Sequence, residues 1–332
     1  MSFIMDIISK AKEEKKKIVL PESMDERVLQ AADKVLREGI ADIILIGSEN
    51  EIRSYEGLDV SKATIINPSS SNLTDTLVNK LYELRKNKGM TMEEARKLLL
   101  TDYMYFACML VNEGLADGVV SGACHSTSNT LRPALQIIKT KPGVKTVSSC
   151  VMLVGTNKLG FGENNVLFCG DSGLNIMPNA EELADIAIAT AGSAKTFSNI
   201  NPKVAMLSFS SFGSGGNKDE SILKVREALR IAKEKAPDLE IDGEMQLDCA
   251  LIDSVAKLKG KGSRVAGKAN VLIFPDLNAG NIGYKLMERF GKLQAVGVIM
   301  QGFNKPINDL SRGCHVEDIV VMTAITVLQT QE

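Results

Sequence analysis

The amino-acid sequence predicts an α/β protein of two domains, each with three layers, α/β/α, around a mainly parallel sheet. Short apolar runs such as residues 41–46 lack polar alternation, which is typical of strands covered on both faces. Amphipathic stretches with helical spacing separate these runs. The chain has 332 residues, which is too long for one compact core and suits two domains.

Strands and helices alternate along the first part of the chain. Residues 25–38 carry apolar side chains at helical spacing and are followed by Gly39, a helix-ending residue. Thr91 precedes Glu94 by three residues, which is the pattern of a helix capping box. The predicted strands are 18–20, 41–46, 63–66 and 118–121, and the predicted helices are 25–38, 73–88, 91–100, 103–113 and 127–139. This alternation predicts parallel strands with right-handed crossovers.

The sequence Lys141-Pro142-Gly143 is the best candidate for a domain boundary. Beyond it, residues 147–154 and 166–169 are predicted to form an antiparallel pair joined by a Gly- and Asn-rich turn at 155–165. Further strands are expected at 204–208, 241–246, 271–274 and 296–300, and helices at 180–197, 221–236, 250–257 and 277–290. We expect the last helix, 316–328, to return to the first domain. The domains would then be 1–142 plus 301–332, and 143–300.

Charge and hydropathy exclude several classes of protein. The net charge of −2 gives no electrostatic footprint for nucleic acid or acidic membranes. No run of eighteen apolar residues occurs, so no membrane-spanning helix is expected. Residues 1–17 mix Lys and Glu with apolar residues and lack the apolar centre of a signal peptide. We therefore expect a soluble, cytoplasmic protein that binds neither nucleic acid nor membranes.

The chain offers few ligands for a metal and lacks the common catalytic motifs. Its six cysteines contain no C-x-x-C pair, and its two histidines are His125 and His315. A structural zinc needs about four close ligands, so no metal is expected and the thiols are expected to be reduced. Walker A, G-x-G-x-x-G and G-x-S-x-G sequences are absent, which argues against nucleotide binding and serine hydrolysis. Cys314 adjoins His315, but adjacency in sequence is weak support for a cysteine nucleophile.

Residues 121–132, S-G-A-C-H-S-T-S-N-T-L-R, connect a buried strand directly to a helix. Free backbone N–H groups at a helix N-terminus, with hydroxyls beside them, form an anion site. The hydroxyls of Ser128 and Thr130 suit such a site, and Arg132, one turn into the helix, would add contacts to phosphate oxygens. The simpler alternative is that Ser128 only caps the helix.

Residues 305–318, K-P-I-N-D-L-S-R-G-C-H-V-E-D, are too polar for a strand, and Pro306 and Gly313 indicate a loop. The segment brings Ser311 and Arg312 close in sequence to Asp309. A solvated connector is one interpretation. The other is a functional loop, because 121–132 and 275–285 are also polar, Gly-containing segments at predicted strand ends, where α/β folds place their chemistry.

Taken together, these segments identify a family resemblance. Residues 121–140, 205–208, 275–285 and 305–313 closely resemble phosphate acetyltransferase (phosphotransacetylase), and the likeness is colinear over essentially the whole chain. The length fits the short form without a regulatory N-terminal extension. The resemblance implies reversible interconversion of acetyl-CoA and phosphate with acetyl phosphate and CoA, without metal or bound cofactor, so that coenzyme A is a substrate. It also implies a cleft between two α/β domains and a homodimer.

The resemblance also implies roles for individual residues. Ser311 and Arg312 match the catalytic Ser-Arg pair of the family, and Asp318 matches the carboxylate proposed as the base for the CoA thiol. Arg132, in T-L-R-P, and Arg85, in Y-E-L-R-K, match arginines implicated in substrate binding, with Arg85 on the CoA side. Position in the chain adds three further candidates for substrate binding, namely Ser128, Thr130 and Asp309.

The role of Asp318 conflicts with its predicted position. A thiol with a pKa near 8.5 and an ordinary Asp near 3.9 differ by about 4.6 units, or about 6 kcal/mol. Asp318 is expected in the first turn of the last helix, whose dipole disfavours protonation. It can therefore act as a base only in a desolvated site or in a transfer concerted with attack.

The expected mechanism is direct attack of the CoA thiolate on the acetyl carbonyl in a ternary complex, without an acetyl-enzyme. Arg312 and Arg132 would hold the phosphoryl group, and Ser311 would hydrogen-bond the thiol or the oxyanion. Three alternatives stay open at this point. One is phosphate butyryltransferase or a related acyltransferase, another is a metal-dependent decarboxylating dehydrogenase of related architecture, and the third is a non-catalytic regulatory role.

Overall fold

The computed structural model describes residues 3–155, 162–260 and 262–331, so most of the predicted turn at 155–165 lies outside the described residues. The chain forms two compact units, Met1–Pro142 with Phe303–Glu332, and Gly143–Gly302. Each unit is a sheet with packed helices, and parallel strand pairs predominate, which confirms the predicted α/β class. Within the described stretches, no helix combines the length and the apolarity that crossing a bilayer requires.

The sheet of the first unit is parallel throughout its described pairs. Its strands are β1 (Lys17–Leu20), β2 (Asp42–Ile46), β3 (Thr64–Ile66), β4 (Gly118–Ser121) and β11 (Ile307–Asp309). Their order is β11-β4-β1-β2-β3. The chain builds outward from β1 to β3 on one side and then places β4 and β11 on the other. The order therefore reverses between β1 and β4, which is a topological switch point.

The existence of β11 corrects the prediction that 305–318 is entirely loop. Asn308 and Asp309 pair in parallel register with Val120 and Ser121 of β4, and both are buried. The Asn308 amide donates hydrogen bonds to Thr326 Oγ1 at 2.8 Å and Gln329 Oε1 at 2.7 Å. Polar residues can form a buried strand when the fold supplies partners, which a count of apolar residues does not detect.

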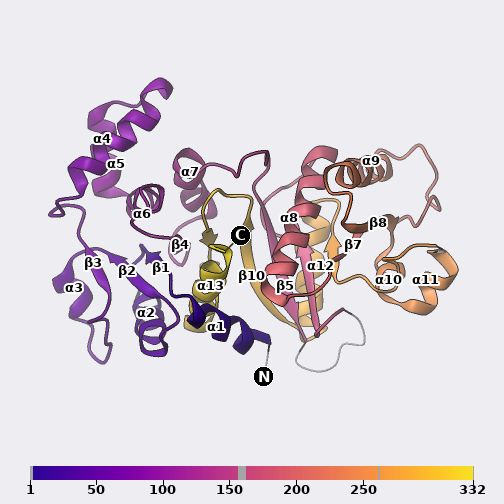
Figure 1. Ribbon diagram of the computed structural model, residues 1–332, viewed down its shortest axis with the longest axis horizontal. Coiled ribbons are helices and arrows are strands. Elements are labelled where there is room, and N and C mark those ends of the chain that lie inside the picture. The colour runs from indigo at the N-terminus through magenta and orange to yellow at the C-terminus, as the bar shows by residue number, and fades with distance from the viewer. Residues whose placement is uncertain (1–2, 156–161, 261, 332) are drawn as a thin grey trace. The chain divides into compact units, whose positions relative to one another are not determined.

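Helices cover both faces of the first sheet (Figure 1). They are α1 (Phe3–Glu13), α2 (Glu26–Glu38), α3 (Glu49–Arg53), α4 (Thr74–Arg85), a 3₁₀ turn (Lys86–Lys88), α5 (Met92–Thr101), α6 (Tyr103–Asn112), α7 (Thr127–Ile137) and α13 (Val316–Gln329). The yellow C-terminal helix α13 packs with α1 and α2, whereas α6 and α7 lie on the opposite side of the sheet. The capping box of Thr91 and Glu94 is confirmed at the start of α5.

The sheet of the second unit has the order β10-β5-β6-β9-β7-β8. Its strands are β5 (Ser148–Val154), β6 (Val166–Gly170), β7 (Lys203–Leu207), β8 (Glu240–Met245), β9 (Val271–Ile273) and β10 (Gln294–Gln301). The predicted antiparallel pairing of β5 with β6 is confirmed, and β10 also runs antiparallel to β5. The neighbouring strands β6, β9, β7 and β8 run parallel to one another.

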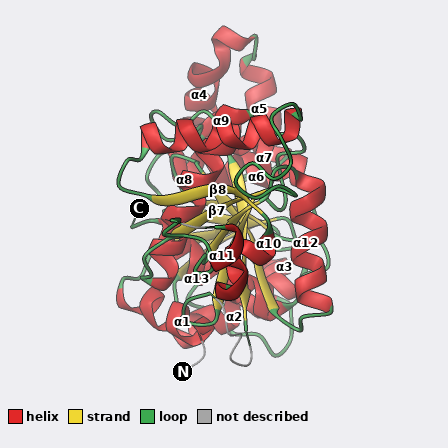
Figure 2. Ribbon diagram, turned by 90° about the vertical axis from the view of Figure 1, so that its right-hand side faces the viewer, coloured by secondary structure: helices red, strands yellow, loops and turns green. Residues whose placement is uncertain are grey.

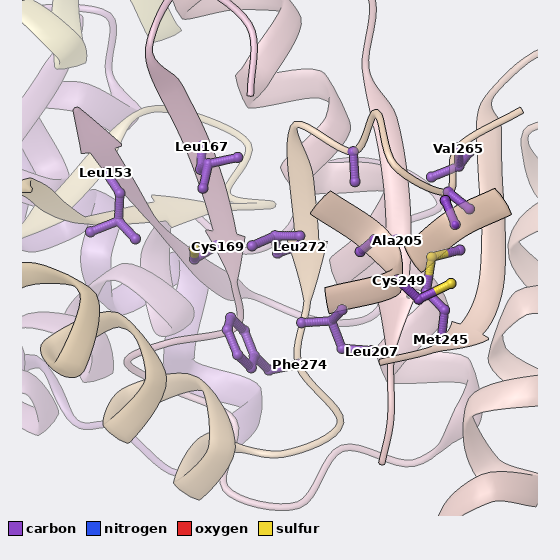
Figure 3. Packing of buried hydrophobic residues seen from close by; sticks show 14 of the residues in the cluster. Leu153, Leu167, Cys169, Ala205, Leu207, Met245, Cys249, Val265, Leu272 and Phe274 are labelled. Carbon is purple, nitrogen blue, oxygen red and sulfur yellow. The ribbon is translucent and has the colours of Figure 1, made fainter. Parts of the chain in front are cut away.

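Helices surround the second sheet as well (Figure 2). They are α8 (Ala180–Ser198), α9 (Glu220–Lys235), α10 (Leu247–Leu251), α11 (Asp253–Lys259) and α12 (Leu277–Arg289). The single helix predicted at 250–257 is wrong, because extended backbone at Ile252 separates α10 from α11. Alternate strand residues, such as Leu167 and Cys169, form one apolar cluster with residues of α10 and α11 (Figure 3).

Candidate active site

Glu22 organises the carboxyl end of the first sheet at its switch point. It follows β1 and is 2% exposed. Its Oε2 accepts the backbone N–H groups of Gly122 and Ala123, both at 2.8 Å, and its Oε1 accepts that of Cys124 at 3.1 Å. One buried carboxylate therefore fixes the loop that leads from β4 to α7. Because open α/β sheets bind ligands in the crevice at such a switch point, this is the candidate active site of the first unit.

Arg27, near the start of α2, ties the same loop to the segment after β11. Its guanidinium donates to the carbonyl oxygen of Ala123 at 2.9 Å and to those of Arg312 and Cys314 at 3.0 and 2.9 Å. It also pairs with Asp25, and this hydrogen bond is the main reason why the pKa of Asp25 is lowered. Sequence reasoning missed Glu22 and Arg27. The available signal was the position of Glu22 directly after a predicted strand and Pro21.

The helix N-terminus predicted as an anion site is formed by α7. Its N-cap is Ser126, whose hydroxyl accepts the N–H of Asn129, so the alternative that Ser128 caps the helix is wrong. Ser128 instead lies exposed in the first turn. The first N–H groups of a helix lack intrahelical acceptors and attract anions. The N-terminus of α7 therefore keeps the capacity to bind an anion that the sequence predicted.

Three buried polar side chains close to the N-terminus of α7, those of Ser121, Thr130 and Asp309, have hydrogen-bonding capacity that the described residues do not use. Thr127 Oγ1 donates to Asp309 Oδ2 at 2.7 Å, which joins the two predicted loops. Among the described atoms, Asp309 Oδ1 and the hydroxyls of Ser121 and Thr130 are buried without a hydrogen bond of normal geometry, although the Thr130 hydroxyl lies close enough to Asp309 to affect its pKa. Burial raises the pKa of Asp309, opposed in part by the hydroxyls of Thr127 and Thr130. Buried polar atoms usually have partners, so these three indicate room for water or substrate groups.

Position 122 accommodates only glycine, because its backbone packs directly against Asp309 and Leu310. A Cβ on Gly122 would lie 2.4 Å from Asp309 Oδ1 and 2.6 Å from the Leu310 nitrogen. The backbone of Gly122 also has a φ of +108°, which disfavours other residues. The close approach keeps the β4 and β11 loops in contact.

Arg85 and Arg132 converge although they are far apart in sequence. Helix α7, which carries Arg132, packs against α4, which ends at Arg85, and against α6. Burial raises the pKa of Tyr105 on α6, and the positive charges of Arg132 and Arg85 oppose this shift. Neither arginine has an ion-pair partner in the described part of the chain. The pair therefore forms a positive region beside the N-terminal half of α7, suited to anionic substrates.

Ser311, Arg312 and Asp318 are all exposed, after β11 and at the start of α13. The Arg312 carbonyl is held by Arg27, and no acidic partner for its side chain occurs among the residues that the structure describes. Ser311 Oγ accepts the N–H of Gly313 at 3.3 Å. Asp318 lies in the first turn of α13, as predicted, and its Oδ2 accepts the backbone N–H of His315 at 2.8 Å. Its carboxylate is therefore already used in capping the helix.

One group of ligand-type side chains gathers in the described residues. Glu22, Cys124 and His125 each place one ligand atom within 4.8 Å of the others. Both lone pairs of Glu22 Oε2 accept backbone N–H groups, and burial, with the nearby Glu22 charge, raises the pKa of the Cys124 thiol to about 12. Metals bind cysteine as the thiolate, so these hydrogen bonds describe the group better than metal coordination does.

The third predicted loop, 275–285, belongs to the second unit and is mostly helix. Asp276 caps α12 by accepting the N–H of Ala279 at 3.0 Å, and Asn281 donates to the Ser172 carbonyl at 3.1 Å. A Cβ on Gly280 would lie 2.3 Å from the Asp171 carbonyl oxygen, so glycine permits the close packing of α12. Within this unit, Asp276 and Asn281 are thus engaged in local structure.

The fold and the strand-end site define an α/β protein with a candidate anion-binding site, which carries several arginines that have no ion-pair partner among the described residues. The chain belongs to the phosphate acetyl/butaryl transferase family, whose model matches residues 2–327, and it is therefore an acyltransferase. It is 56% identical over 332 residues, covering 100% of both chains, to a phosphate acetyltransferase of Thermoanaerobacterium thermosaccharolyticum. It is 52% identical to that of Clostridium acetobutylicum, over 100% of this chain and 99% of the other.

A solved structure agrees with these relatives. A phosphotransacetylase from Streptococcus pyogenes superposes with a TM-score of 0.92 at 45% identity, covering 99% of this chain and 98% of that one. The family match favours the acyltransferase prediction over the dehydrogenase and regulatory alternatives.

Proposed function

We propose that this chain is a phosphate acetyltransferase that converts acetyl-CoA and phosphate into acetyl phosphate and CoA, reversibly. One observation carries the choice of substrates: 56% identity over the full length to a protein named for this activity. The site is consistent with it, because a helix N-terminus and arginines that lack ion-pair partners in the described stretches suit phosphate and the phosphates of CoA.

In the proposed reaction the CoA thiolate attacks the acetyl carbonyl of acetyl phosphate directly. Arg312 and Arg132 bind the phosphoryl group and stabilise the charge of the leaving phosphate. Ser128 and Thr130 line the phosphate end, and Arg85 binds the CoA phosphates. Ser311 donates its hydroxyl proton to the developing oxyanion, since its Oγ only accepts within the structure. Asp309 orders the start of α7 through Thr127.

We propose Asp318 as the group that accepts the thiol proton, as the family motif suggests. Its Oδ2 already accepts the His315 N–H, and an ordinary aspartate is a much weaker base than a thiolate. The role therefore requires transfer concerted with attack. Asp318→Asn tests it, because asparagine can still accept the N–H and preserve the cap. We expect kcat to fall at unchanged melting temperature. A normal kcat in this variant would remove Asp318 from the role of base.

The activity is tested by following thioester formation and loss by absorbance, with phosphate and CoA varied separately and EDTA present. We expect turnover that depends on both substrates and is insensitive to EDTA. Comparison of kcat/KM for acetyl-CoA and butyryl-CoA decides between the two acyl groups in the family name, and we expect acetyl to be preferred. Intersecting initial-rate lines are expected for a ternary complex. Parallel lines or trapped acetyl-enzyme would contradict direct transfer.

We also propose that the enzyme is a cytoplasmic homodimer, on the basis of the family resemblance. Size-exclusion chromatography with light scattering should give about 72 kDa, twice the chain mass of 35.9 kDa. A mass equal to one chain would contradict the dimer.

A further inference from the structure

His125 and Glu22 form a pair that the reaction outlined above does not use. His125 Nδ1 lies 2.6 Å from Glu22 Oε1, and the two side chains are 40% and 2% exposed. Glu22 acts as an acceptor toward three backbone N–H groups, two on Oε2 and one on Oε1. The hydrogen between the pair therefore belongs to Nδ1. This tautomer leaves Nε2 as the exchangeable nitrogen, and no described residue hydrogen-bonds it.

The ring lies at the phosphate end of the site. His125 directly precedes Ser126, the N-cap of α7, where backbone N–H groups attract anions. Its backbone position is fixed from both sides, because Glu22 holds Cys124 and Ser126 starts the helix. A histidine oriented through Nδ1 by a buried carboxylate is the arrangement that catalytic histidines use to transfer protons at Nε2.

A proton donor and acceptor would assist the chemistry of phosphate. When the C–O bond of acetyl phosphate breaks, negative charge develops on the departing phosphate oxygen. In the opposite direction, a protonated phosphate must lose a proton as it attacks the thioester. An ordinary imidazole has a pKa near 6.5 and a phosphoryl group has a second pKa near 6, so proton transfer between them is nearly balanced around neutral pH.

We propose that His125, oriented by Glu22, is the acid–base residue for the phosphate end of the reaction. This inference rests on the proposed function. As acetyl phosphate reacts, the S–C bond forms, the C–O bond to phosphate breaks, and the Nε2 proton of the imidazolium passes to the leaving oxygen. In reverse, neutral Nε2 takes that proton as phosphate attacks acetyl-CoA and the S–C bond breaks. Glu22 is a positioning residue, and Asp318 remains with the thiol.

Other charged and titratable groups surround the pair and affect the same pH range. They are Asp25 and Arg27 at the start of α2, Asp309 at the end of β11, and the thiols of Cys124 and Cys314. Burial raises the pKa of both thiols. An effect of pH must therefore be assigned by substitution of His125 itself.

The test is the pH dependence of kcat in both directions for the full chain and for His125→Gln. We expect kcat of the variant to fall about 10²- to 10⁴-fold, the usual contribution of general acid–base catalysis. In the wild type, kcat should fall with rising pH when acetyl phosphate is consumed and with falling pH when acetyl-CoA is consumed. Both limbs should be absent from the variant, and added imidazole should partly restore kcat of His125→Ala.

NMR provides a readout that does not depend on turnover. The chain has two histidines, so ¹⁵N correlation spectra should show two imidazoles, and His315→Gln assigns them. We expect His125 to carry its proton on Nδ1 and its Nε2 signal to shift when inorganic phosphate is added. Glu22→Gln should weaken the tautomer preference. A kcat above one tenth of wild type with unchanged pH limbs in His125→Gln would overturn the proposal, as would an Nε2–H tautomer.

These outcomes are separate from those of the proposed function. If the wild-type chain shows no transfer between CoA and phosphate, the proposed function fails, and with it the catalytic role of His125. If the wild type is active and His125→Gln retains its rate and pH profile, only the role of His125 fails.

Discussion

Both units have buried carboxylates near strand ends, but the hydrogen-bond partners of these carboxylates differ between the units. In the second unit, Glu244 is 2% exposed and accepts hydrogen bonds from Ser210, Gly213 and the guanidinium of Arg226. Asp171, also 2% exposed, accepts the backbone N–H groups of Gly173, Leu174 and Asn175. Both oxygens of each carboxylate accept hydrogen bonds from nearby structural groups, so both carboxylates stabilise local structure.

In the first unit, hydrogen-bonding capacity is left over. Glu22 orders a backbone loop as Glu244 does, but its remaining partners are the Cys124 thiol and the half-exposed ring of His125 rather than an arginine. Nearby, Asp309 Oδ1 and the hydroxyls of Ser121 and Thr130 are buried without partners in the described structure. Buried polar atoms without partners are unfavourable, so a fold that keeps them indicates a ligand or water that completes them. The difference between these strand-end groups therefore distinguishes a candidate binding site from the structural carboxylates Glu244 and Asp171, although Asp185 Oδ2 on α8 of the second unit is also buried without a partner.

The largest effect is expected for an arginine of the candidate site compared with an arginine outside it. Arg312→Gln should lower kcat about 10²- to 10³-fold, because it removes a charge that stabilises the transition state. Arg230→Gln is the matched control, since Arg230 is exposed on α9 and pairs with Glu227 and Glu234. Steady-state kinetics should show the control within twofold of wild type. Equal rates for both variants would mean that Arg312 has no special role.

The next comparison changes the two buried glutamates in the same way. In Glu22→Gln the N–H groups of Gly122 and Ala123 should exchange faster, and in Glu244→Gln the N–H group of Gly213 should. In each case the free energy of local opening should fall by roughly 1–3 kcal/mol. Hydrogen exchange measures both effects at the individual amides. We expect only Glu22→Gln to lower kcat, by about tenfold or more. Loss of activity in Glu244→Gln alone would reverse our assignment of the two sites.

Acid should weaken the second unit through Glu244. Burial raises the pKa of Glu244, but hydrogen bonds from Arg226, Ser210 and Gly213 outweigh burial and lower it to about 2. Because the folded pKa is depressed, the stabilisation is present above the ordinary pKa of 4.5 and is lost as pH falls toward 2. The protection of the Gly213 amide, measured as its exchange rate relative to the intrinsic rate at the same pH, should therefore fall between pH 4.5 and 2, and this fall should be absent in Glu244→Gln. Protection that does not change with pH in the wild type would contradict the assignment.

The smallest expected effect is a gain in stability rather than a loss. Burial raises the pKa of Asp309, so its ionised form destabilises the fold increasingly as pH rises above the ordinary value of 3.8. Asp309→Asn keeps an acceptor for Thr127 without the charge, and it should raise the melting temperature at pH 7 by a few degrees, corresponding to about 1 kcal/mol. We expect kcat/KM to fall in the same variant. Lower stability with unchanged activity would make Asp309 a purely structural residue.

Much of the fold could be predicted because its signals are local. Apolar runs identified most strands, and the capping box of Thr91 and Glu94 and the glycine that ends α2 lie where expected. The polar strand β11 was missed because Asn308 gains its partners only from α13. Ile252 likewise divides a predicted helix in two, without a Gly or Pro to indicate it.

The sequence by itself determined the α/β class, the family resemblance, and candidate residues in Arg85, Arg132, Ser311, Arg312 and Asp318. Only the tertiary structure showed that Glu22 holds the loop of His125, 103 positions away, and that Arg27 reaches the Arg312 carbonyl across 285 positions. The physical reason is the order of the strands. Residues so distant along the chain meet because β1, β4 and β11 are neighbours with parallel carboxyl ends, and no local pattern specifies which strands pair.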